Sequence, residues 1–184
     1  MQYINQSFVS EIRQKFCNVN TCPISGDRIF FENAGGALTL KSALETTTKF
    51  ASIPDNQGRD NAASKTLNDV IKNAKRDLSA LFNTQSGEFF MGESGTELLF
   101  RLIRNAVIAS PSGGSIVGTS LEHPASRSAA KKWSNELKYT YLSVPHCVKT
   151  GTVDPKNYAG KISDTTRVVT IVHASPVTGM GTKI

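Results

Sequence analysis

The stretch GESGTELLFRLIR, residues 92–104, holds the residues whose types and spacing best suit chemistry. It follows the apolar run 89–91, which predicts a strand, and it opens a segment with leucine and isoleucine at helical spacing. A small-residue turn between a strand and a helix exposes backbone N–H groups at the positive end of the helix dipole, which suits a phosphate. Ser94 and Thr96 add hydroxyl donors, and Gly95 lets the backbone approach closely. An ordinary capped helix start explains the same residues.

The elements that must position this turn alternate between strand and helix. Helical spacing or composition predicts helices at 8–16, 40–50, 61–82, 95–109, 125–137 and 155–162. Short apolar or β-branched runs predict strands at 28–31, 88–91, 115–119, 139–144 and 167–172. This alternation indicates an α/β fold of three layers, with a mostly parallel sheet and crossover helices. No linker or internal repeat divides the chain, so we expect one domain over residues 1–184, with a short helical segment at about 1–24.

Three loops are expected at the carboxyl ends of strands, where open α/β sheets bind ligands. They are residues 92–96, 120–126 and 173–179, and each carries small or polar residues. Their convergence at one edge of the sheet favours the phosphate interpretation of the first loop over a plain helix cap.

Composition excludes several other classes. The 184 residues carry a formal charge of +6, but the basic residues are scattered and no zinc-finger or RNA-binding signature occurs, so we expect no nucleic-acid partner. No apolar run approaches the roughly 18 residues of a membrane span, and the N-terminus does not resemble a secretory signal, so we expect a soluble, cytoplasmic protein. The cysteines, Cys17, Cys22 and Cys147, form no C-x-x-C pair, so we expect no metal site and incidental thiols.

Four motifs, in this order, resemble those of the class V aminotransferases, the cysteine desulfurase-like branch of the fold type I enzymes that use pyridoxal 5′-phosphate (PLP). They are FFENAGG (30–36), GESGTELLF (92–100), SLEHPAS (120–126) and VVTIVHASPVTG (168–179). The resemblance covers the chain from about residue 25 onward. It implies an incomplete large domain of such an enzyme, with PLP as cofactor, an amino acid as substrate and a homodimer as the assembly.

The resemblance also implies roles for individual residues. Ser94, Gly95 and Thr96 would hold the cofactor phosphate, mostly through backbone amides. His123 would stack on the pyridine ring, although a histidine bonded to the backbone at a strand end explains the same position. His173 is expected to close its strand end. The turn Asn33, Ala34, Gly35 and Gly36 would face the substrate, although a structural turn explains its glycines nearly as well.

Two departures from the family pattern limit these expectations. Pro176 stands where many relatives have asparagine, and proline offers no donor to the cofactor's phenolic oxygen. The aspartate that faces the ring nitrogen and the lysine that forms the Schiff base are expected beyond the point matching Ile184, as is the small C-terminal domain. Lys183 precedes that aspartate and does not substitute for the lysine. The expected protein is therefore an N-terminal portion that is inactive alone, or alternatively a truncated relative acting as a binding or interaction module.

Overall fold

The chain divides into two compact units, residues 1–87 and 88–184. The computed structural model describes residues 5–54 and 58–182, so Lys183 and Ile184 lie outside the described residues. The single domain expected over residues 1–184 stays a prediction.

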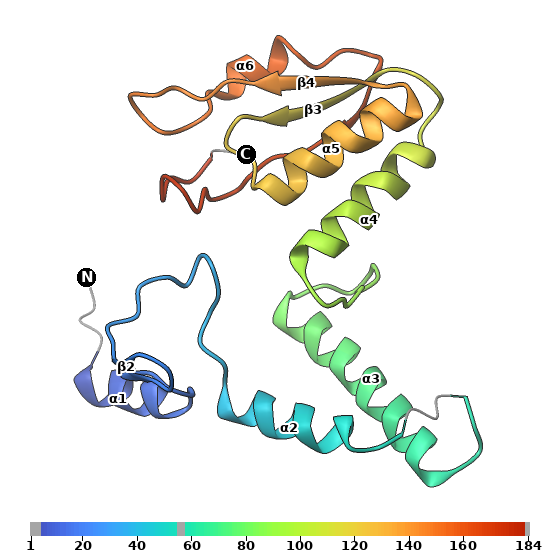
Figure 1. Cartoon of the computed structure of the whole chain (residues 1–184). Coiled ribbons are helices and arrows are strands. Elements are labelled where there is room, and N and C mark those ends of the chain that lie inside the picture. Colours follow the sequence, from blue (N-terminus) through green and yellow to red (C-terminus); the bar gives the residue numbers. More distant parts are fainter. Residues whose placement is uncertain (1–4, 55–57, 183–184) are drawn as a thin grey trace. The chain divides into compact units, whose positions relative to one another are not determined.

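The N-terminal unit is built from helices and one small hairpin (Figure 1). Its elements are α1 (Gln6–Gln14), β1 (Thr21–Cys22), β2 (Gly26–Asp27), α2 (Lys41–Ala51) and α3 (Ala62–Leu81). The strands β1 and β2 pair antiparallel, and Gly26 takes a φ of 80° in this short hairpin, a conformation that glycine adopts without strain.

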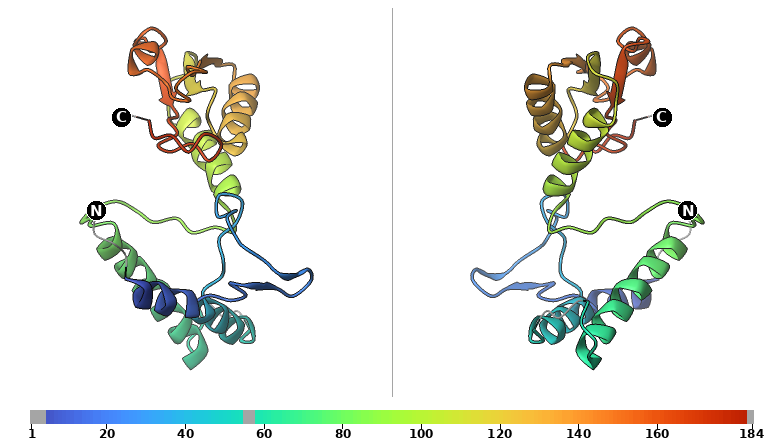
Figure 2. Two further views of the ribbon diagram at one scale, coloured as in Figure 1. Left: turned by 90° about the vertical axis from the view of Figure 1, so that its left-hand side faces the viewer. Right: turned by 90° about the vertical axis from the view of Figure 1, so that its right-hand side faces the viewer.

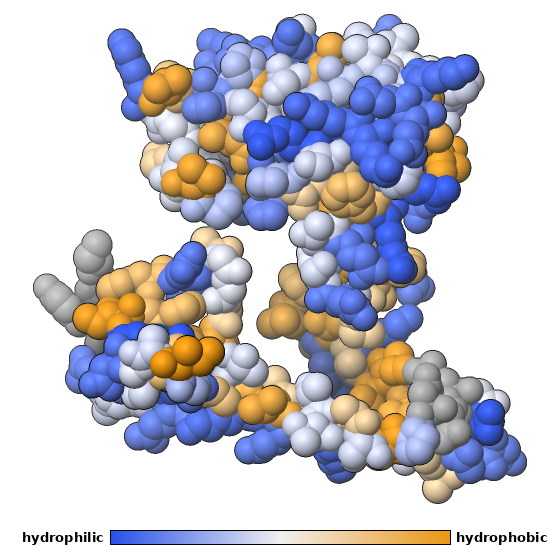
Figure 3. Space-filling model, in the orientation of Figure 1, coloured by the Kyte–Doolittle hydropathy of each residue, from blue (hydrophilic) through white to orange (hydrophobic). Residues whose placement is uncertain are grey.

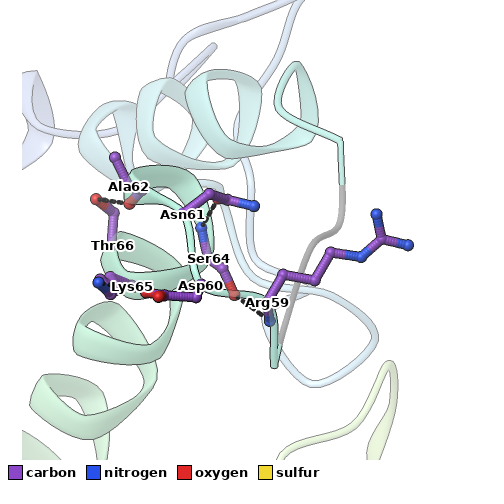
Figure 4. A network of polar contacts seen from close by, with 7 residues as sticks. All are labelled: Arg59, Asp60, Asn61, Ala62, Ser64, Lys65 and Thr66. Atoms are coloured by element: carbon purple, nitrogen blue, oxygen red, sulfur yellow. Dashed lines mark hydrogen bonds and ion pairs between the residues drawn. The ribbon is translucent and has the colours of Figure 1, made fainter.

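Helix α3 begins at a network of polar contacts around its cap (Figure 4). The side chain of Asn61 accepts a hydrogen bond from the amide of Ser64 at 2.9 Å, the usual way to satisfy a first-turn N–H. The Ser64 hydroxyl, which is fully buried, accepts from the amide of Arg59 at 3.0 Å. Lys65 pairs with Asp60 at 2.5 Å. These contacts fix the start of α3 at the residue that the sequence predicts.

Apolar side chains of the N-terminal unit reach the surface over its helices, as Figure 3 shows. The described residues of α2 include no buried side chain, and in α3 only Ser64 is buried. Leu81 and Phe82, at the end of α3, are 75% and 65% exposed. No apolar side chain of α3 is fully buried, and both clusters of buried hydrophobic residues found among the described residues lie in the C-terminal unit.

The C-terminal unit is an α/β sandwich around a parallel sheet (Figures 1 and 2). Its elements are α4 (Gly95–Ile108), β3 (Ser115–Thr119), α5 (Pro124–Leu137), β4 (Thr140–Val144), α6 (Pro155–Ala159) and β5 (Thr166–Val169). The strand order is β4-β3-β5, and β3 pairs parallel with both neighbours. Parallel pairing requires a crossover between strands, which α5 and α6 supply.

Two apolar clusters cover the two faces of this sheet, so the unit has three layers. On one face, Ile103 and Val107 of α4 pack with Ile116 of β3 and with Ala129 and Ala130 of α5. On the other face, a cluster of four buried residues joins strands β3 and β4 to the segment around α6: Val117, Val144, Val153 and Tyr158. The three-layer, parallel α/β architecture predicted from the sequence is confirmed for this unit.

Two of the predicted strands are wrong. Residues 28–31 and 88–91 form no strand, although their apolar composition is typical of one. Ile29, Phe31 and Phe90 are each 84–88% exposed. A strand needs a neighbour to complete its backbone hydrogen bonds, and neither run has one within the described residues. The strand predicted at 167–172 is shorter, since β5 ends at Val169.

Within the described ranges, no helix combines the length and the hydropathy that crossing a bilayer requires.

Candidate functional site

The first turn of α4 is shaped by its own side chains. Ser94 is the N-cap residue, and its hydroxyl accepts a hydrogen bond from the amide of Glu97 at 3.2 Å. The carboxylate of Glu97 accepts from the amide of Glu93 at 3.3 Å and pairs with Arg101 at 2.6 Å. This variant of the capping box holds the residues before the helix in place. The loop 92–96 therefore has a defined shape, as the sequence predicts for a helix start.

Two amides at this turn have no acceptor within the described part of the chain. The amides of Gly95 and Thr96 make no hydrogen bond there, nor does the Thr96 hydroxyl, and all three residues 94–96 are exposed. A Cβ placed on Gly95 would meet no atom within 4 Å, so open space lies beside these amides. Free N–H groups, a nearby hydroxyl and the helix dipole together suit a phosphate group. The residues present therefore fit the phosphate end of the implied cofactor.

The loop after β3 is organised by a buried carboxylate. Glu122 is only 7% exposed. One of its oxygens accepts from the amide of Val172 at 2.8 Å and from the hydroxyl of Thr119 at 3.2 Å. The other oxygen accepts from the hydroxyl of Ser126 at 3.0 Å. Glu122 thus joins three segments, namely the end of β3, the first turn of α5 and the chain that follows β5.

His123 follows this carboxylate and is the N-cap residue of α5. Its Nδ1 accepts a hydrogen bond from the amide of Ala125 at 3.1 Å, which assigns the proton of the neutral ring to Nε2. The ring is exposed, while its backbone is fixed between Glu122 and Pro124. The histidine is therefore bonded to the backbone at the strand end, and its exposed ring remains accessible to a ligand.

A second connection at this edge of the sheet involves a histidine that the sequence does not single out. The hydroxyl of Ser120 lies 2.7 Å from Nδ1 of His146 and accepts from the His146 amide at 2.9 Å. Ser120 follows β3 and His146 follows β4, so this pair fixes the ends of two neighbouring strands against each other. Nothing in the local sequence of His146 indicates this, because its partner is 26 residues away.

The loop after β5 forms a compact turn around Ser175, which is 3% exposed. The Ser175 hydroxyl accepts from the amides of Val177 and Thr178, each at 3.3 Å, and residues 174 and 181 form an isolated bridge. Pro176 is exposed at the tip of this turn. The carbonyl of His173 accepts from the amide of Thr182 at 2.8 Å, so the backbone of this histidine closes the loop while its side chain stays exposed.

The structure brings these three loops to one side of the C-terminal unit. In Figure 1, the arrowheads of β3 and β4, the first turn of α5 and the loop around Ser175 lie on the same side of the sheet, and α4 also begins on that side. Helices α4 and α5 run in the same direction. The carbonyl of Phe100, early in α4, accepts from the indole N–H of Trp133, and the carbonyl of Val107, later in α4, accepts from the hydroxyl of Tyr139, which follows α5. The three loops therefore lie on one side of the unit, as the sequence predicts, although the first of them, residues 92–96, follows no strand.

The predicted substrate-side turn belongs to the N-terminal unit. The amides of Gly35 and Gly36 donate to the carbonyl of Glu32 at 3.0 and 3.2 Å, and residues 33–35 form the turn itself. Neither glycine takes a positive φ, so backbone conformation alone does not require glycine there. Its role toward the substrate stays a prediction.

Hydrogen bonds lower the pKa of two of the cysteine thiols. The hydroxyl and then the amide of Ser25, followed by the amide of Ile24, lower the pKa of Cys22 to about 7. Hydrogen bonds from the hydroxyl and amide of Thr150, and then from the amide of Lys149, also lower the pKa of Cys147. The sequence gives no sign of either effect, because turn geometry supplies the donors. In the described ranges, no three side chains of metal-ligand type come together.

Comparison with known proteins agrees with this architecture. The C-terminal unit places the chain among α/β proteins with a parallel sheet and crossover helices. Residues 29–184 match the model of the aminotransferase class-V family, and the chain belongs to that family. A cysteine desulfurase of Nostoc sp. is 30% identical over 114 residues, which are 61% of this chain and 28% of the relative. The cysteine desulfurase-like protein ustD of Aspergillus flavus is 29% identical over 163 residues, 85% of this chain and 37% of the relative.

Solved structures show the same fold. The cysteine desulfurase CsdA of Escherichia coli matches with a TM-score of 0.72 and 17% identity, over 95% of this chain and 43% of that one. The cysteine desulfurase of Thermococcus onnurineus matches with a TM-score of 0.77 and 16% identity, over 95% of this chain and 42% of that one. The chain thus spans well under half the length of these relatives.

Proposed function

We propose that this chain is the N-terminal portion of a PLP-dependent, cysteine desulfurase-like enzyme acting on an amino acid, and that the start of α4 holds the cofactor phosphate. The observation that carries the proposal is the pair of free amides at Gly95 and Thr96, at a helix N-terminus beside the Ser94 and Thr96 hydroxyls. Family membership supports it. So does a structural neighbour, C-DES, a variant of which holds glycine covalently linked to its PLP cofactor.

In this proposal the chain's own residues bind and orient the cofactor. The amides of Gly95 and Thr96 would donate hydrogen bonds to the phosphate oxygens, and the ring of His123, oriented by the hydrogen bond that its Nδ1 accepts from the Ala125 amide, would cover the pyridine ring. Pro176 would stand on the side of the phenolic oxygen, as the family resemblance implies, and as a proline it would donate no hydrogen bond to that oxygen. When bound, PLP draws electrons from the bonds at the α-carbon of an amino acid. The turn Asn33–Gly36 would face the substrate.

Assembly and location follow the family in this proposal. The enzyme is a homodimer that acts on an amino acid, as the family resemblance implies, and it is cytoplasmic.

The phosphate site is tested with 4′-deoxypyridoxine 5′-phosphate. This compound lacks the aldehyde of PLP, so it cannot react with surface lysines and reports only on non-covalent binding. Calorimetry should show saturable 1:1 binding, and the same compound without its phosphate should bind at least tenfold more weakly, a difference of about 1.4 kcal/mol.

Gly95→Ala is the informative variant for this experiment. The added methyl meets no protein atom within 4 Å, so the fold should tolerate it, yet it stands beside the amides that hold the phosphate. We expect about tenfold weaker binding, equal to roughly 1.4 kcal/mol. Gly160→Ala, at another tolerant glycine, is the matched control and should bind normally. Equal affinity for the phosphorylated and unphosphorylated compounds would refute the phosphate site and favour the alternative of a non-catalytic binding module.

A further inference from the structure

Two adjoining cavities lie in the N-terminal unit, apart from the cofactor site at α4, and the smaller one is lined in part by Gly36 of the predicted substrate-side turn. The larger, of about 510 Å³, lies between α1, the residues before β1 and the start of α2. The smaller, of about 260 Å³, has a wall formed by Gly36, Ala37, Leu38 and Thr39. Asn18 lines both cavities and takes a φ of 51°, in the left-handed region.

The charges around these cavities all have the same sign. Arg13 and Lys41 line the larger cavity and Arg28 lines the smaller one, whereas no aspartate or glutamate lines either. Arg13 donates to the side-chain oxygen of Asn20, which is neutral. The nearest carboxylate on α1, that of Glu11, is already paired with Lys15 at 3.2 Å. Within the described residues, the three cations therefore face these cavities without a carboxylate partner.

Contacts hold Arg28 both at its backbone and at its guanidinium group. Its backbone amide donates to the carbonyl of Asn20 at 2.9 Å, next to the β1–β2 hairpin. One end of its guanidinium donates to the carbonyl of Asn18 at 2.8 Å, and the group lies 5.0 Å from the centre of the Phe30 ring. Its Nε is buried and has no hydrogen-bond acceptor in the described part of the chain.

An arginine held in this way has donors to spare. A guanidinium carries five N–H groups, and the carbonyl of Asn18 accepts from one of its ends. The group stays charged at any physiological pH, and burying part of a charge without a counter-ion costs free energy. A planar anion recovers that cost, because a guanidinium binds carboxylate and phosphate oxygens in pairs.

We propose that the smaller cavity is a binding site for a small anion, carrying a carboxylate or phosphate group, that Arg28 holds from the side opposite Asn18. Arg13 and Lys41 in the adjoining cavity add a favourable field for the same charge. The size of the cavity limits the ligand to a compact molecule. This proposal does not depend on the cofactor site at α4, and either can fail without the other.

The experiment follows the Arg28 side chain by NMR. The Nε–H resonance of Arg28 is assigned by its loss in Arg28→Lys, and the wild-type chain is titrated with inorganic phosphate and, separately, with acetate. Chloride keeps the ionic strength constant, so that general screening does not contribute. The expected result is a saturable 1:1 shift of the Arg28 resonance with at least one of the two anions, while the Arg101 resonance, already paired with Glu97, stays unchanged.

Variants separate a site from a diffuse basic surface. Arg28→Met should weaken anion binding at least tenfold. The affinity is measured from the shift of the Gly36 amide resonance, because Gly36 lines the same cavity. Arg59→Met removes an exposed cation that lines neither cavity and should leave the affinity unchanged. If Arg28→Met does not fold, the titration of the wild-type chain still tests whether Arg28 binds an anion. A linear, unsaturated drift shared by all arginine resonances, or no shift with either anion, overturns the proposal.

Discussion

Replacing Glu122 should show how strongly one buried carboxylate holds the edge of the sheet. Three donors meet on it, namely the Val172 amide at 2.8 Å and the hydroxyls of Ser126 and Thr119 at 3.0 and 3.2 Å. The described residues include no ion pair to Glu122, so these hydrogen bonds are what compensates for its burial.

The expected cost differs between two substitutions. Glu122→Ala leaves three donors without their acceptor. The two hydroxyls can rotate toward other acceptors, but the backbone amide of Val172 cannot. Each buried unsatisfied group costs about 1–3 kcal/mol, and the hydroxyls regain part of this through new hydrogen bonds. The free energy of unfolding should therefore fall by roughly 3–5 kcal/mol. Glu122→Gln keeps a carbonyl oxygen for Val172 and Thr119, and the Ser126 hydroxyl can accept from the new amide. Only the charge-assisted part is lost, so we expect about 1 kcal/mol.

Urea unfolding followed by tryptophan fluorescence measures both variants. Trp133 is the only tryptophan in the sequence and lies on α5 in the C-terminal unit, so its signal reports on the unit that contains Glu122. The control is Glu136→Gln, which removes an exposed ion pair with Lys132 and should cost less than about 0.5 kcal/mol. If Glu122→Ala costs no more than this control, or if the glutamine variant costs as much as the alanine variant, the reasoning is refuted.

Two further predictions concern the residues around the same sheet. Burial, and secondly the nearby charge of Glu122, raise the pKa of Tyr158 to about 12. Because the folded state favours the neutral phenol, this contribution to stability is complete below about pH 10, the ordinary tyrosine value, and is lost as the pH rises toward 12. Absorbance at 295 nm should show a late tyrosine ionisation that Tyr158→Phe removes, and ionisation of every tyrosine near pH 10 would contradict this. Gly118→Ala places a methyl 2.7 Å from the Thr170 hydroxyl and 2.9 Å from that of Tyr141, and should cost about 1–3 kcal/mol in the same urea assay. Gly95→Ala, which meets no atom within 4 Å, should leave stability unchanged, and an equal cost for both variants would disprove the steric argument.

The helices were predictable because their signals are local. Helix α3 begins after Asn61 and ends before Phe82, where the sequence places it, since a capping asparagine and an apolar period are both readable within one segment. The same holds for α4, whose capping serine and first-turn glutamate occur in the motif itself. The strands β3 and β4 were also predicted, because each forms a buried or alternating run between clear turns.

The errors and omissions arise from contacts between distant residues. Residues 28–31 and 88–91 have strand-like composition, but strand formation depends on a partner that composition does not report. The sequence predicted the position of His123 and the loop that carries it. It did not predict that Glu122 would reach the Val172 amide, 50 residues away, or that Ser120 would pair with His146. Such pairs depend on strand order, which no local pattern determines.

These distant pairs explain how the candidate site keeps its shape. Ser120 ties the end of β3 to the end of β4, and Glu122 ties it to the chain after β5. The loop carrying His123 is therefore held on both sides by the neighbouring strands of the sheet, while the start of α4 is held by its own cap. Groups fixed in this way lose little freedom when a ligand binds, which favours affinity and correct orientation. On this argument, substitution of Glu122 should disturb ligand contacts at His123 while leaving phosphate contacts at Gly95 nearly unchanged.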